Sequence, residues 1–256
     1  MLAGNMLMPK VLPVMTKVAP RMNVHMNVHI VVPSYNHWEL THELIWNLYR
    51  KERMEISSLL IVDNGSTDKE VADGLKWWTR DINMPYQFPI NVLRIEENCG
   101  FLLASNRGLQ DAVGILSNPG DIIILLSNDV QIHSKFIWQI RDILESKSRV
   151  VVGGKLYTSD TGWNTFGAIT FPYLEGWLLA TRACDWYELG YFDPIFAPQD
   201  YEDIDFSVTA FNAGYDLVPL NNVGLVHKGA ATYGYNPERE ANTIKNKEKF
   251  RQKWIK

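Results

Sequence analysis

Apolar runs of strand length alternate with amphipathic segments through the first half of the chain, and this alternation limits its fold more than any other feature. Residues 28–33 (VHIVVP) are apolar apart from His29, and the run 122–126 holds only Ile and Leu, which is typical of strands covered on both faces. Between them, residues 38–52 place four Leu or Ile side chains on one helical face. Strands alternating with helices predict an α/β fold with a mainly parallel central sheet and flanking helices.

The pattern changes after residue 154, where aromatic and glycine-rich segments predict shorter, mixed strands. In the first half we expect further strands at 57–63 and 91–98. We also expect three more helices there, one that extends toward residue 78, one that starts near residue 102 and one at 136–144. In the second half we expect a helix at 184–189, a strand ending at 226 and a polar helix from about 237. A helix from about 203 to 213 is expected to turn Ile204, Val208 and Phe211 inward.

Composition narrows the classes of function. Of the 256 residues, 46% are hydrophobic and 21% are charged, a globular balance that allows a sizeable core. The net charge of -4 gives no reason to expect general affinity for nucleic acid. Two cysteines, Cys99 and Cys184, are too few for a disulfide scaffold, and we expect both as buried thiols.

Residues 1–27 are expected to form a flexible leader. Pro9, Pro13 and Pro20 interrupt its apolar stretches, whereas a secretory signal needs an unbroken apolar run of roughly 7–15 residues. The chain also lacks the ~20 consecutive apolar residues needed to cross a bilayer. We therefore expect a cytoplasmic protein without a transmembrane segment. Peripheral contact with a membrane and assembly into a homo-oligomer are left open.

Polar residues follow the predicted strands at the edge where parallel α/β sheets bind ligands. Together with Pro33 and Gly100, the residues at these strand ends are Pro33, Tyr35 and Asn36 at the first, Asp63 at the second, Asn98 and Gly100 at the third, and Asn128 and Asp129 at the fourth. Tyr35 could stack on a base or cover the sheet edge. Asp63 could accept a hydrogen bond from a pyrimidine base or cap the next helix. Asn98 and Gly100 could shape a turn.

An acidic run precedes the helix expected from residue 203. The segment 199–206 (QDYEDIDF) carries four carboxylates in six positions. The helix macrodipole and N-capping account for one or two acids at such a place, but not for four. Downstream, His227 ends the last predicted strand, where a lone histidine is ordinarily a core or surface residue.

These segments together resemble the glycosyltransferases of family 2, which have the GT-A fold, in a form close to bacterial rhamnosyltransferases. The motifs that carry the likeness are IVDNGSTD at 61–68, NCGFLLASNRG at 98–108, SND at 127–129, EDIDF at 202–206 and the histidine in LVHKG. The likeness covers about residues 28–235. It implies one GT-A domain over 28–256, with a nucleotide-binding half at 28–130 and an acceptor-binding half at 131–256.

The resemblance also implies roles for individual residues. Asp203 is the catalytic base, which Glu202 orients, and Asp129 and His227 hold Mn²⁺ or Mg²⁺, cations that accept carboxylate and, for Mn²⁺, imidazole ligands. The residues implied for the nucleotide sugar are Pro33, Tyr35, Asn36, Asp63, Asn98, Gly100, Asn106, Asn128 and Asp129. Those implied for the acceptor are Glu175, Gly176, Trp177 and Asp205, although Asp205 could also hold the loop and Trp177 could simply pack in the core.

The expected activity is an inverting, metal-dependent transfer of a sugar from a nucleotide diphosphate to a hydroxyl of a carbohydrate or other acceptor, as in polysaccharide biosynthesis. An oxidoreductase with a dinucleotide-binding fold would need a glycine-rich turn, yet the chain contains no G-x-G. The P-loop pattern of phosphotransferases is also absent from the sequence. A non-catalytic nucleotide-sugar or glycan-binding module of the same fold remains the alternative.

Overall fold

A computed structural model of the chain describes residues 26–80, 88–229, 234 and 236–255. The predicted leader therefore lies outside the described residues, apart from Met26 and Asn27. The backbone N–H of Asn27 donates a hydrogen bond of 3.0 Å to Asp121 Oδ1, which fixes the chain just before the first strand. No helix in the described ranges is both long and apolar enough to span a membrane.

Seven strands form the central sheet, in the order β12-β6-β11-β4-β1-β2-β3. Their bounds are β1 Val28–Ser34, β2 Ser58–Asn64, β3 Ile90–Ile95, β4 Ile122–Leu126, β6 Val150–Gly153, β11 Leu178–Arg182 and β12 Asp216–Pro219. Strand β11 runs antiparallel to its neighbours β4 and β6, whereas the other pairs are parallel. The predicted mixed, mainly parallel sheet is therefore confirmed.

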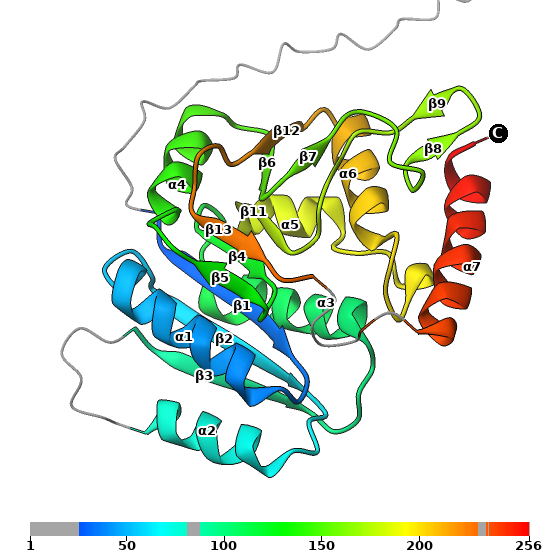
Figure 1. Cartoon of the computed structure of the whole chain (residues 1–256). Coiled ribbons are helices and arrows are strands. Elements are labelled where there is room, and N and C mark those ends of the chain that lie inside the picture. Colours follow the sequence, from blue (N-terminus) through cyan, green and yellow to red (C-terminus); the bar gives the residue numbers. More distant parts are fainter. Residues whose placement is uncertain (1–25, 81–87, 230–233, 235, 256) are drawn as a thin grey trace, which may run out of the picture.

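Helices cover both faces of this sheet (Figure 1). The first face is covered by α1 Trp38–Glu52, α2 Lys69–Thr79 and α4 Ile137–Ser146. The second is covered by α3 Phe101–Asp111, α5 Ala183–Leu189 and α6 Glu202–Asn212, with a π-helical turn at Ala112–Leu116. The last helix, α7 Pro237–Trp254, packs against the 3₁₀ turn Pro194–Phe196 and inserts the buried Phe250 into the second layer.

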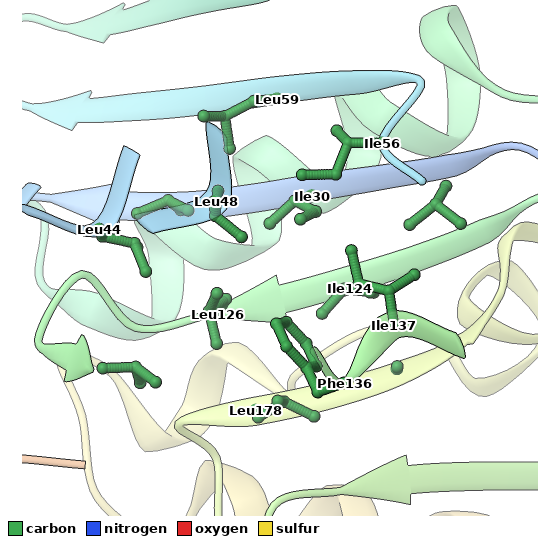
Figure 2. Packing of buried hydrophobic residues seen from close by; sticks show 14 of the residues in the cluster. Ile30, Leu44, Leu48, Ile56, Leu59, Ile124, Leu126, Phe136, Ile137 and Leu178 are labelled. Atoms are coloured by element: carbon green, nitrogen blue, oxygen red, sulfur yellow. The ribbon is translucent and has the colours of Figure 1, made fainter. Parts of the chain in front are cut away.

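The two layers follow from the alternation of side chains along each strand. In β1, Ile30 joins the core beneath α1 and α4, whereas its neighbour Val31 joins the core on the other face. Figure 2 shows the first core, where Ile30 and Ile124 of adjacent strands lie between Leu48 of α1 and the residues at the start of α4. All of β1, β2 and β4 is buried, as their continuous apolar runs predict.

Two expectations about side chains were wrong. Phe211, expected to face inward on α6, is 58% exposed, while Ile204 and Val208 of the same helix are buried. Helical spacing gives a direction around the axis, but does not say how far along the helix the covering layer extends. Both cysteines are free thiols, yet Cys184 is exposed and Cys99 is only partly buried.

Short two-stranded ribbons follow the main sheet, as predicted for the second half. They are β5 Val130–Ile132 with β13 Leu225–His227, β7 Leu156–Tyr157 with β10 Tyr173–Leu174, and β8 Thr165–Phe166 with β9 Ile169–Thr170. All three pairs are antiparallel. The β5–β13 ribbon matters most for the site, because it brings His227 beside the segment that follows β4.

Candidate active site

A cavity of about 850 Å³ opens at the carboxyl ends of β1 and β4. It extends past the start of α6 to α7. Ten residues predicted for the site line it, namely Pro33, Tyr35, Asn128, Asp129, Glu175, Gly176, Trp177, Glu202, Asp203 and His227. The fold therefore brings to one cavity residues from both halves of the chain.

Asp129 and His227 lie in direct contact at this cavity. Val130 pairs with His227 across the β5–β13 ribbon, and His227 Nε2 lies 3.2 Å from Asp129 Oδ1. The backbone N–H of Lys228 donates to the carbonyl oxygen of Asp129 over 3.2 Å, which adds a second link between the same segments. A carboxylate and an imidazole this close form a pair of ligands suited to a cation such as Mn²⁺. In the described part of the chain, no cluster of three or more His, Cys, Asp or Glu side chains could hold a metal.

Trp177 supports the histidine of this pair. Its ring stacks on His227 with centroids 5.4 Å apart and an interplanar angle of 17°. The indole Nε1–H donates to Glu175 Oε2 over 2.9 Å, and the side chain is only 9% exposed. A Cβ on Gly154 would lie 2.1 Å from the same ring, so the indole is closely packed on that side as well. The sequence left open a sugar platform or core packing, and the structure gives this ring close packing.

Asp203 lies in the first turn of α6 and faces the cavity. Its Oδ2 accepts a 3.0 Å hydrogen bond from the backbone N–H of Gly176, and its Oδ1 accepts one of 2.8 Å from the N–H of Ile204. Burial raises the pKa of Asp203 to about 6, assisted by the negative charges of Asp200 and Glu175 and opposed by the two N–H donors. The side chain remains partly exposed, so a ligand in the cavity can reach it.

Glu202, one residue earlier, is more deeply buried than Asp203. Burial and the adjacent charges of Asp203 and Asp200 raise the pKa of Glu202 well above its usual range, while the guanidinium of Arg239 opposes that rise. The two neighbouring acids therefore differ in access, and the more accessible one is Asp203.

Asp205 is not at the cavity. Its Oδ2 accepts a hydrogen bond of 2.9 Å from Lys253 Nζ, and its Oδ1 accepts one of 2.7 Å from Trp254 Nε1. The residue is 2% exposed, so it joins α6 to the end of α7. Of the two functions considered for Asp205, this position supports holding the structure together and corrects the expectation that it contacts an acceptor.

Asp63 and Asn36 are also absent from the cavity lining. Asp63 accepts from the backbone N–H of Ser66 over 3.1 Å and from Arg94 Nη1 over 2.5 Å. Asn36 Oδ1 accepts from the N–H groups of Thr67 and of the following residue at 2.9 and 3.1 Å. These bonds fix the loops after β1 and β2, and neither residue lines the cavity.

Asn98, Gly100 and Asn106 likewise lie outside the cavity lining. Asn98 Oδ1 accepts from the N–H of Gly100 over 2.9 Å, which shapes the turn considered from the sequence. Gly100 has a positive φ of 86°, and a Cβ there would lie 2.4 Å from Pro198. The amide of Asn106 both donates to and accepts from the backbone of Phe192, a buried link between α3 and the loop after α5.

Several cavity residues were missed by sequence reasoning. Six of them lie on α7, namely Pro237, Arg239, Glu240, Thr243, Ile244 and Lys247, and Trp163 lies on the loop between β7 and β8. The only signal in the sequence was a polar helix from about residue 237, which indicates a solvated surface as readily as a site. Their position at the cavity depends on how α7 packs, and no local pattern encodes that.

Comparison with known proteins shows the family to which the chain belongs. The model of the family "Glycosyl transferase family 2" matches residues 29–207. A dolichol-phosphate mannosyltransferase from Pyrococcus furiosus is 22% identical over 130 residues, which are 51% of this chain and 33% of that enzyme. The chain belongs to glycosyltransferase family 2.

Two solved structures are similar over most of the chain. GalNAc-T7 with UDP, GalNAc and Mn²⁺ has a TM-score of 0.70 at 14% identity, over 90% of this chain and 49% of that one. The mannosyltransferase PcManGT from Pyrobaculum calidifontis in complex with GDP-Man and Mn²⁺ has a TM-score of 0.61 at 18% identity, over 86% of this chain and 61% of that one. These similarities show that the chain has the GT-A fold. The chain thus spans between a third and two thirds of the length of these proteins.

Proposed function

We propose that the protein is an inverting, metal-dependent glycosyltransferase that moves a sugar from a nucleotide diphosphate to an acceptor hydroxyl, with Asp203 as the general base. The observation that carries this proposal is the shared cavity, which is lined by the Asp129–His227 pair and by the accessible carboxylate of Asp203. Family membership and the similarity to nucleotide-sugar enzymes support the reaction class.

The metal in this proposal would be held by Asp129 and His227. One carboxylate and one imidazole leave most coordination positions to the substrate's phosphate oxygens, as is usual for cations that act on diphosphates. When bound, such an ion would neutralise the negative charge that develops on the departing diphosphate. The stacked ring of Trp177 keeps the imidazole of His227 turned toward Asp129.

Asp203 is suited to accept a proton from the attacking hydroxyl. A pKa of about 6 keeps most of the side chain ionised at neutral pH and still close to the range in which general bases work best. The N–H donors of Gly176 and Ile204 hold both carboxylate oxygens in place without occupying all of their lone pairs. The deprotonated hydroxyl oxygen then attacks the anomeric carbon opposite the leaving group, and the configuration inverts.

The two ends of the cavity separate donor from acceptor in this proposal. Pro33, Tyr35 and Asn128 lie at the carboxyl ends of β1 and β4, where α/β sheets bind nucleotides. The opposite end is lined by α7 and by Trp163, whose side chain is 53% exposed. We place the acceptor there, with the indole of Trp163 as the surface for a sugar ring in place of the packed Trp177.

Finer specificity stays a prediction. The likeness to rhamnosyltransferases favours a deoxysugar donor, whereas the similar solved structures contain GalNAc with UDP, and GDP-Man. A cytoplasmic location and a role in polysaccharide biosynthesis also stay predictions.

The test is release of nucleotide diphosphate from a panel of nucleotide sugars in the presence of Mn²⁺, with Asp203→Asn as the variant. General-base assistance contributes about 10²–10⁴-fold to the rate of such reactions. We therefore expect Asp203→Asn to turn over donor at least about 10²-fold more slowly than the unmodified protein, while it still binds UDP or GDP. Asp216→Asn is the matched control, since Asp216 is an exposed acid on β12 outside the cavity lining. Full turnover by Asp203→Asn would refute the base assignment. Nucleotide binding without turnover by the unmodified protein would favour the non-catalytic binding module.

A further inference from the structure

The loop that leads into α6 has a backbone shape that its own residues do not favour. Asp200 and Tyr201 both have left-handed backbones, with φ of 70° and 78°. L-residues rarely adopt this region, and two in succession persist only where surrounding contacts impose the shape. Tyr201 is also the N-cap of α6, without a side-chain capping bond. The start of the helix that carries Glu202 and Asp203 is therefore set from outside.

Contacts from α7 supply that constraint at the side chain of Asp200. Arg239 Nη2 donates to Asp200 Oδ1 over 2.8 Å, and Arg239 Nε donates to Oδ2 over 3.2 Å. Thr243 Oγ1 donates to Oδ2 over 2.6 Å. Asp200 thus accepts a two-point interaction from a guanidinium and a third bond from a hydroxyl one turn later on the same helix.

The same helix also holds the backbone of the loop. Asn246, which is fully buried, donates from Nδ2 to the carbonyl oxygens of Phe196, Gln199 and Asp200 at 2.7, 2.9 and 3.0 Å. Asn242 Nδ2 donates to the Gln199 carbonyl oxygen over 2.8 Å. We call the four α7 side chains Arg239, Asn242, Thr243 and Asn246 the α7 clamp.

We propose that the α7 clamp positions the catalytic acids, and that Arg239 is a positioning residue which acts on Asp203 through Asp200. This inference rests on the proposed function of Asp203. The four clamp side chains lie beyond residue 207, where the match to the family model ends. Its consequence is that α7, at the opposite side of the molecule from α2, belongs to the working site (Figure 1).

The hydrogen bonds of Arg239 argue for positioning and against a primary role in binding an anionic ligand. Nε and Nη2 engage Asp200, and Nη1 donates to the carbonyl oxygen of Gly234 over 3.2 Å. The guanidinium is therefore directed at the protein through all three of its nitrogens, although it borders the cavity. Its charge also opposes the rise in the pKa of Glu202 that burial causes, so it compensates the acidic run that it holds.

The experiment compares Arg239→Ala and Arg239→Lys with Arg251→Ala in the full chain. Arg251 lies on the same helix but on its exposed face, paired with Glu248 at 2.7 Å, which makes it a matched arginine control. Three quantities are measured. They are the rate of nucleotide release from a nucleotide sugar that the unmodified protein uses as donor, the affinity for UDP and for GDP in the presence of Mn²⁺, and the hydrogen exchange of peptides covering residues 197–206.

We expect Arg239→Ala to lower the release rate by about 10²-fold, since displacement of a catalytic group by about an ångström costs that much. Exchange over 197–206 should become faster, nucleotide affinity should stay within about threefold of the unmodified protein, and Arg239→Lys should be intermediate. Arg251→Ala should match the unmodified protein.

Unchanged rate and exchange in Arg239→Ala would overturn the proposal, and so would a loss of nucleotide affinity with unchanged exchange. If the unmodified protein turns over no donor, the proposed function fails, while the exchange data still decide whether the clamp holds the loop.

Discussion

The backbone N–H of Gly176 donates a hydrogen bond of 3.0 Å to Oδ2 of Asp203, so the loop before β11 holds the carboxylate at the start of α6. A Cβ on residue 176 would lie 3.1 Å from Asp203 Cβ, closer than most such contacts in proteins. The absence of a side chain at Gly176 is therefore what allows this approach. Any added atom must displace the acid or the loop.

Gly176→Ala should accordingly lower the transfer rate by about tenfold while nucleotide affinity is unchanged, because only the positioning of Asp203 is disturbed. The measurement is steady-state turnover together with a thermal shift in UDP or GDP. Gly120→Ala serves as the control, since a Cβ there meets nothing within 4 Å. Equal rates for both variants would mean that the contact with Gly176 does not set the position of the acid.

The pH dependence of transfer should report the carboxyl of Asp203. A general base works in its deprotonated form, and burial raises its pKa to about 6. The rate should therefore be level above neutrality, fall as pH drops through 6, and be about tenfold lower at pH 5. The profile of kcat/KM between pH 5 and 8 tests this, and the residual rate of Asp203→Asn should lack the step. A flat profile for the unmodified protein would contradict the assignment.

Removal of either proposed metal ligand should abolish the stabilisation by nucleotide plus Mn²⁺. We expect Asp129→Asn and His227→Ala to lose the increase in Tm that UDP or GDP with Mn²⁺ produces, and EDTA to remove both that increase and turnover. His133→Ala is the control, because His133 is exposed and outside the cavity lining. Activity that survives EDTA undiminished would show that no metal is needed.

Asp205→Asn should reduce stability and leave the chemistry of the folded protein intact. The buried carboxylate accepts bonds from Lys253 and Trp254, and leaving such donors poorly satisfied costs about 1–3 kcal/mol. Urea unfolding measures the loss. Asp193→Asn, which affects the same lysine at a more exposed carboxylate, should cost less. A stable Asp205→Asn variant with an impaired acceptor KM would instead restore the acceptor role expected from the sequence.

Trp163→Ala should weaken acceptor use without affecting donor hydrolysis. Aromatic contacts of this kind contribute about 0.5–1.5 kcal/mol, so the acceptor KM should rise by roughly threefold to tenfold. Trp138→Ala is the matched control, because Trp138 is also 53% exposed but lies on α4 outside the cavity lining. If both variants use the acceptor equally well, the sugar ring does not rest on Trp163.

Part of the candidate site could be predicted because it lies at strand ends. Apolar runs placed the ends of β1 and β4 correctly, and parallel pairing brings those ends to one edge of the sheet. Asn128 and Asp129 reach the cavity for that reason. Asp63 lies at a strand end too, but its carboxylate turns to Arg94 of β3, a contact between separate strands that no local pattern encodes.

The acidic run shows the same limit more sharply. Asp203 and Asp205 are two positions apart on α6 and therefore point about 200° apart around its axis. The resemblance implied that Asp203 is the base, and it left two roles open for Asp205, contact with an acceptor or holding the loop. Packing decided it, because α7 supplies Lys253 and Trp254 to Asp205 and leaves Asp203 to Gly176.

By itself, the sequence determined the order of strands and helices along the chain, the burial of both faces of the sheet and the polar residues at the strand ends. It could do so because the period of hydrophobic residues is a local property. Only the tertiary structure decided which carboxylates face the cavity, which residues Asp129 and His227 contact, and that α7 holds the loop before α6. Those outcomes depend on the packing of segments that are distant along the chain. The direction of each side chain is settled there by burial and by the donors that a neighbouring element presents.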